Sequence, residues 1–132
     1  MNIVNVINSL SGVITLPPID KSEIAKAEEI LGITFPIEFV EYSKAFGCVT
    51  SDEIELFGLT QHKRLSVVYN TLLMRQNVES FPSDVYVVED LGIECMVTVQ
   101  SSQGIIYKYS PAGLDRVADS LADYLLQKKA KP

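Results

Sequence analysis

The sequence has no tryptophan, one histidine and only two cysteines among 132 residues. It also has no apolar run long enough to cross a bilayer, and its start, MNIVNVINSL, has no basic segment ahead of an apolar one. We therefore expect no membrane span, no signal peptide and a cytoplasmic location. Cys48 and Cys95 have neither metal-binding nor redox spacing, so we expect two buried, reduced thiols and no disulfide.

Positive charge is scarce. Eleven Lys and Arg residues stand against seventeen Asp and Glu residues, which gives a net charge of −6. This balance opposes binding to nucleic acid or to an anionic membrane and favours a basic protein partner. Residues 1–61 contain nine acids and three bases, whereas residues 105–132 contain three acids and five bases. The acidic surface is therefore expected mostly in the N-terminal half.

The usual signatures of a catalytic site are also missing. His62 lies in a polar stretch before an expected helix, which favours a surface loop over a Cys–His pair with Cys48 or Cys95. The glycines form neither GxGxxG nor a phosphate-binding loop. Adjacent carboxylates such as Glu28-Glu29 are typical of a solvated helix face. We expect no catalytic residue, no cofactor and no metal.

What is present is enough apolar material, 47% of residues, for one core, and we expect one domain over residues 1–132. The clearest stretch is 20–47, which predicts two helices joined by a tight corner. Asp20 is suited to cap the first helix, Gly32 to end it, and Pro36 to stand in the first turn of the second. Apolar residues follow at helical spacing, namely Ile24, Ala27, Ile30, Leu31, Phe39, Tyr42 and Phe46.

The remaining chain predicts an α+β fold. Helical spacing is found in residues 2–10, 65–76 and 114–125, and β-branched or alternating runs in 54–59, 85–88, 96–100 and 105–109. Turn residues at Leu91-Gly92 and in 101–104 make an antiparallel meander the simplest pairing of the last three strands. We expect a mixed or antiparallel sheet of about four to six strands, wrapped by N-terminal helices, a middle helix and a C-terminal helix.

Two assignments remain open at this stage. Arg75 is expected to hold Glu89 or Asp90 in a structural pair, and the alternative is that it contacts a partner. Tyr107 and Tyr109 share one strand face, and a core position is favoured over a role as interface anchors.

The ordered set of helix, corner and turn residues resembles the SUKH superfamily, which includes a yeast cell-wall regulator domain and many bacterial immunity proteins. The resemblance covers nearly the whole chain. It rests on packing and turn residues: Ala27-Glu28, Leu31-Gly32, Phe35-Pro36, Phe39, Phe46-Gly47, Leu56–Gly58, Val67-Val68, Thr71, Arg75 and the ending Val117–Leu125.

The resemblance implies an α+β domain and, in bacteria, neutralisation of a cognate polymorphic toxin, frequently a nuclease. It implies no catalytic residue. The chain departs from the family pattern at Gly92-Ile93-Glu94-Cys95 and at Thr98-Val99-Gln100, where many relatives carry a Gly-Asp-aromatic turn followed by an aspartate. Partner contacts in that region therefore cannot be transferred to this chain.

Three functions follow, in order of preference. The first is a bacterial immunity protein that blocks a basic toxin, the second an intracellular regulator or scaffold of the same fold, and the third an enzyme. For the first, the expected contact face is the polar side of the strand at 54–59, with Asp52, Glu53 and Glu55 as charged contacts. Phe57 and Tyr42 are the expected apolar anchors, and Phe57 is expected to be exposed because it shares strand parity with Glu55.

Overall fold

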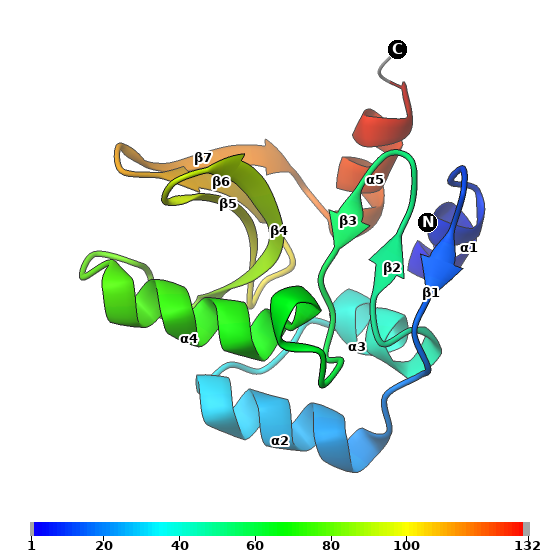
Figure 1. The fold of residues 1–132 in the computed structure, drawn as a ribbon, viewed down its shortest axis with the longest axis horizontal. Coiled ribbons are helices and arrows are strands. Elements are labelled where there is room, and N and C mark those ends of the chain that lie inside the picture. The colour runs from blue at the N-terminus through cyan, green and yellow to red at the C-terminus, as the bar shows by residue number, and fades with distance from the viewer. Residues whose placement is uncertain (1, 131–132) are drawn as a thin grey trace.

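The fold consists of two antiparallel sheets with helices packed against them (Figure 1). It is seen in a computed structural model that describes residues 2–130. The α+β prediction is confirmed, but the strands divide into a small sheet and a large one instead of forming a single sheet. Within residues 2–130, no helix has the length and apolar character needed to span a bilayer.

The N-terminal helices begin and end close to where the sequence predicts. Helix α1 (Ile3–Asn8) is followed by α2 (Lys21–Leu31) and α3 (Ile37–Ala45). Asp20 Oδ1 accepts the backbone N–H of Glu23 at 2.9 Å and the hydroxyl of Ser22 at 2.8 Å, and these bonds lower the pKa of Asp20. Gly32 has a left-handed φ of 66°. The caps are therefore confirmed, although α3 begins one residue later than predicted, with Pro36 as its cap.

The small sheet contains β1 (Ile14–Thr15), β2 (Val49–Thr50) and β3 (Glu55–Leu56), in that order. Strand β1 was not predicted, and the expected strand at 54–59 is only two residues long. Below this sheet, Gly47 N donates to Leu16 O at 3.0 Å, and Gly47 O accepts from Thr60 N at 3.2 Å. A Cβ atom on Gly58 would lie 2.0 Å from Gly47 O. A Cβ atom on Gly47 would lie 2.5 Å from Pro17 O, so the close approach of backbone segments requires both glycines.

The large sheet is an antiparallel meander of β4 (Val85–Ile93), β5 (Met96–Ser101), β6 (Ile106–Ser110) and β7 (Gly113–Ala118). The meander is confirmed. The turn between β4 and β5 lies at Glu94-Cys95, three residues after the predicted Leu91-Gly92, and Cys95 has a positive φ of 61°.

The predicted helix from residue 114 is wrong in its first half. Residues 113–118 form β7, which pairs with β6 through Tyr109↔Leu114 and Tyr107↔Arg116, and α5 spans only Leu121–Ala130. The apolar positions at 114, 117 and 118 fit a helix, but the backbone groups of β6 were available to pair with this segment, so tertiary pairing decided its structure. Lys128 and Lys129 occupy the last turn of α5, and Lys131 of the predicted basic tail lies outside the described residues.

A β-bulge in β4 connects the two sheets. The register shifts between Val87 and Glu89, and Val88 O accepts the N–H of Phe57 at 2.9 Å. Glu89 points inward and pairs with Lys128 of α5 at 3.1 Å. The predicted pair of Arg75 with Glu89 or Asp90 is therefore wrong. Glu89 already has a cation, Asp90 forms no ion pair within residues 2–130, and Arg75 donates to Ser83 O at 3.0 Å.

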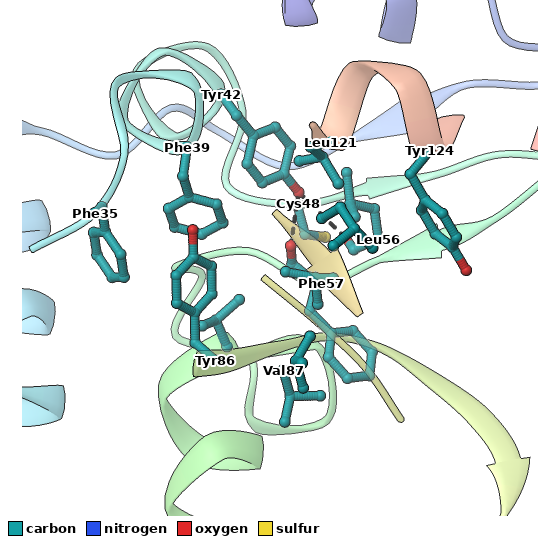
Figure 2. Packing of buried hydrophobic residues seen from close by; sticks show 14 of the residues in the cluster. Phe35, Phe39, Tyr42, Cys48, Leu56, Phe57, Tyr86, Val87, Leu121 and Tyr124 are labelled. Carbon is teal, nitrogen blue, oxygen red and sulfur yellow. Dashed lines mark hydrogen bonds between the residues drawn. The ribbon is translucent and has the colours of Figure 1, made fainter. Parts of the chain in front are cut away.

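Buried aromatic rings form the centre of the core (Figure 2). The Phe35 and Phe39 ring centroids are 4.7 Å apart, and Phe39 and Tyr86 are 4.8 Å apart. Tyr86 OH donates to Gln100 Oε1 at 2.7 Å, and burial raises the pKa of Tyr86 well above its usual value. Tyr109 is buried and Tyr107 half-buried, so the core assignment is confirmed for Tyr109.

A carboxylate distant in sequence caps the C-terminal helix. Glu38 of α3 accepts the backbone N–H groups of Leu121 at 2.7 Å and Ala122 at 3.0 Å, and it also accepts from Gln100 Nε2 at 2.9 Å. An acidic group at a helix N-terminus satisfies free donors and complements the helix dipole. Glu38 therefore ties α3, β5 and α5 together and has a structural role.

Candidate functional site

The predicted acidic contacts lie around the turn between β2 and β3. Asp52 is exposed, and its backbone N–H donates to Ser11 O at 2.8 Å. Glu53 is half-buried, and its carboxylate accepts the N–H of Ser11 at 3.0 and 3.3 Å. The Asp52 carboxylate lies beside Gly12, where a Cβ atom would be 2.6 Å from Oδ1. These contacts hold both acids against the loop that follows α1.

Glu55 differs from the other two because it already has a cation. Arg64 makes two hydrogen bonds to its carboxylate, at 2.7 and 3.1 Å, and this pairing raises the pKa of Arg64. Both side chains are substantially exposed, so the pair contributes little to stability. The unneutralised charge of the acidic turn, defined as Asp52, Glu53 and Glu55, therefore rests on Asp52 and Glu53.

The two predicted apolar anchors are not on the surface. Phe57 is 3% exposed and Tyr42 is fully buried, and Figure 2 shows both among the core side chains. The parity argument failed because β3 ends at Leu56, and the chain then turns so that Phe57 N bonds to Val88 O. Tyr42 OH donates to Phe57 O at 2.9 Å. Neither ring can anchor a partner without unfolding of the core.

Sequence reasoning missed an apolar surface on the outer side of α4 (Val67–Asn77). Tyr69, Leu72 and Leu73 are 42%, 41% and 40% exposed, and together we call them the α4 outer face. The sequence shows helical spacing over residues 65–76, which predicts a helix but does not say which side of it faces the core. In the structure Val67 and Thr71 are the buried residues of α4, so the side that carries Tyr69, Leu72 and Leu73 faces outward.

A groove runs along each side of the α4 outer face. The groove towards α2 has a volume of about 360 Å³, and its walls include Ile30, which is exposed rather than buried as predicted. The groove towards the β4–β5 turn, here the hairpin groove, has a volume of about 320 Å³. Leu73, Ile93 and Met96 contribute apolar walls to the hairpin groove, with Asp90 and Glu94 among its lining.

The two cysteines and the one histidine differ in exposure. Cys48 is 2% exposed, and burial, followed by the nearby charge of Glu55, raises the pKa of its thiol. Cys95 is half-buried in the wall of the hairpin groove, and both cysteines are free. His62 is exposed at the start of η1 (Lys63–Leu65), as expected for a surface loop.

Comparison with known proteins relates the chain to one family and to a solved fold. The SUKH_5 family, described as SMI1-KNR4 cell-wall, matches residues 2–129. A crystal structure of a protein from Pseudomonas syringae pv. tomato is similar, with a TM-score of 0.73 and 15% sequence identity over 92% of this chain and 91% of that chain. At this identity the likeness concerns the fold alone. The search of curated proteins gives no match.

Proposed function

The chain belongs to the SMI1-KNR4 cell-wall family (SUKH_5), and from this membership we propose that it is a bacterial cytoplasmic immunity protein that neutralises a basic toxin. The family match over residues 2–129 carries the proposal, because bacterial members of the SUKH superfamily often act in this way. The surroundings of the cysteine and the histidine are compatible with it: Cys48 is buried with a raised pKa, and His62 is exposed in a loop.

The charge of the chain supports a basic partner. The net charge is −6, and residues 1–61 alone contain nine acids and three bases. An immunity protein must capture its toxin before damage occurs, and opposite charge raises the encounter rate by electrostatic steering. This benefit should weaken as salt concentration rises, because salt screens charges that are more than a Debye length apart.

We place the first contact at the acidic turn of Asp52, Glu53 and Glu55. Asp52 and Glu53 are held by hydrogen bonds to the loop after α1, so their positions are fixed before a partner arrives. A cation from the partner can pair directly with Asp52 or Glu53. To pair with Glu55, it would first have to displace Arg64. Asp52 and Glu53 should therefore matter more to binding than Glu55.

The proposal predicts a toxin gene beside this one, and the product of that gene is the test ligand. Purified toxin is mixed with the wild-type chain and with the triple variant Asp52→Lys, Glu53→Lys and Glu55→Lys, and the association rate is measured at low salt. A second triple variant, Glu79→Lys, Asp84→Lys and Asp115→Lys, changes the net charge equally at exposed acids elsewhere. Circular dichroism confirms that both variants fold.

We expect the first variant to associate more slowly than the second and to lose protection from the toxin. Equal rates for the two variants would show that net charge, and not the acidic turn, governs encounter. An unchanged rate and unchanged protection in the first variant would exclude this face as the binding site.

The alternative is a regulator or scaffold of the same fold without a toxin partner. The family description as SMI1-KNR4 cell-wall favours it, because the yeast members are cell-wall regulators. The neighbouring genes separate the two proposals. A toxin gene directly upstream favours immunity, and its absence favours regulation.

A further inference from the structure

The orientation of α4 leaves its most apolar face in solvent. Figure 1 shows α4 between the large sheet and α2, and the helix packs on both. Its inward side is fixed by Val67, which is fully buried, and by Thr71, whose hydroxyl accepts the N–H of Val87 at 2.9 Å. Tyr69, Leu72 and Leu73 therefore point away from the core, although their side chains are suited to burial. Large apolar groups grouped on a surface mark interaction sites.

The apolar surface continues beyond α4 on both sides. Ile30 of α2 is 47% exposed at the first groove, and Ile93 of β4 is 61% exposed at the hairpin groove. The α4 outer face thus forms a ridge with an apolar groove on each flank. This shape fits an amphipathic helix of a partner better than a flat partner surface. Apolar side chains of such a helix can enter the groove beside the ridge.

Charge distinguishes the two grooves. The first is bordered by Glu23, Lys26 and Lys63, which are of both signs. The hairpin groove is bordered by Asp90 and Glu94, and its lining contains no cation. Both carboxylates are exposed, and neither forms an ion pair within residues 2–130. A ligand of the hairpin groove should therefore carry positive charge next to its apolar side chains.

From this combination we propose that the α4 outer face and the hairpin groove bind an amphipathic helix of a partner protein. Leucine-like side chains of that helix pack against Leu73, Ile93 and Met96, and its Lys or Arg residues face Asp90 and Glu94. The surface is separate from the acidic turn at Asp52, Glu53 and Glu55. The proposal does not depend on the partner being a toxin.

The test uses a synthetic peptide as the probe, a fluorescently labelled amphipathic helix of leucine and lysine. Its affinity for the full-length chain is measured by fluorescence anisotropy. Two control peptides are used. A helix of leucine and glutamate lacks the matching charge, and a scrambled leucine–lysine peptide of the same composition lacks the apolar stripe.

Three variants locate the binding site on the protein. Leu73→Asp places a charge in the ridge, and the pair Asp90→Lys with Glu94→Lys reverses the charge of the hairpin groove. Ile37→Asp is the matched control, because Ile37 is an exposed apolar residue on α3 outside either groove. We expect Leu73→Asp and the double variant each to weaken binding by about tenfold or more, and Ile37→Asp to leave it within about twofold.

A second measurement does not rely on variants. Amide shifts of the wild-type chain, recorded with and without the leucine–lysine peptide, should change mainly in residues 69–77 and 90–97. Equal binding of all three peptides, equal weakening by Ile37→Asp, or shifts centred elsewhere would overturn the proposal. A dimer of the chain alone that Leu73→Asp dissociates would also overturn it, because a second copy would then be the occupant of this face.

Discussion

The hydroxyl oxygen of Thr71 accepts the backbone N–H of Val87 at 2.9 Å, and both residues are buried. This bond joins α4 to β4 next to the β-bulge, and it fixes which side of α4 faces the core. Thr71→Val keeps the shape but leaves the N–H of Val87 unpaired, which should lower the free energy of unfolding by ~1–3 kcal/mol. Thr71→Ser keeps the acceptor and should cost less in urea denaturation. A Thr71→Val protein as stable as Thr71→Ser would contradict this role.

Gly58 cannot be replaced by alanine, because the added Cβ atom would lie 2.0 Å from Gly47 O and 3.1 Å from the Cα of Cys48. Relief would require the two backbone segments to separate, which would break the bond of Thr60 N to Gly47 O that joins them. We expect Gly58→Ala to be insoluble or strongly destabilised. Gly92→Asn is the control, since Gly92 has open space around it and Asn tolerates its positive φ of 76°. A Gly58→Ala melting temperature equal to that of Gly92→Asn would refute the account.

Leu31 and Ile30 are adjacent on α2 but lie on different sides of it. Leu31 is 3% exposed and Ile30 is 47% exposed. Leu31→Ala should lower the free energy of unfolding by ~2–5 kcal/mol through lost burial and a residual cavity. Ile30→Ala should cost much less, because water already reaches that side chain. Thermal melts of the two variants compare the sites directly, and equal losses would mean that Leu31 is not a core residue.

Cys48 and Cys95 should differ in reactivity. Burial raises the pKa of the Cys48 thiol, and since the thiolate is the reactive form, little of it is present near neutral pH. Cys95 is half-buried and more accessible. We expect an alkylating reagent to label Cys95 first in the folded protein and Cys48 only after denaturation, with intact mass recording each addition. A mass two hydrogens lower, with neither thiol labelled, would reveal a disulfide and contradict the reduced state.

The local signals of the sequence predicted the local parts of the fold. The cap at Asp20 and the left-handed Gly32 depend on neighbours within a few residues, and the structure confirms both. Residues 114–118 were wrongly predicted as helix, because their structure is decided by hydrogen bonds to the partner strand β6. The spacing of residues within the segment does not reveal that it pairs with β6.

The candidate site was harder to predict from local sequence signals than the fold was. Asp52 is exposed, as a charged residue in a turn should be, while Phe57 is buried because of a bond to Val88 on another sheet. The apolar stripe of Tyr69, Leu72 and Leu73 was visible in the sequence, but periodicity cannot tell which face of a helix meets the core. The polar Thr71 faces the core because its hydroxyl accepts the N–H of Val87. The apolar side chains of Tyr69, Leu72 and Leu73 consequently lie on the surface.

The central claim is that the chain protects a cell from a toxin, and growth tests it most directly. The product of the toxin gene that the proposal predicts beside this one is expressed from an inducible promoter. The cells carry the wild-type chain, the Asp52→Lys, Glu53→Lys and Glu55→Lys variant, or an empty vector. The account predicts normal growth with the wild-type chain, arrest with the empty vector, and reduced protection with the variant at equal protein levels. Arrest in cells that contain the folded wild-type chain would contradict the claim.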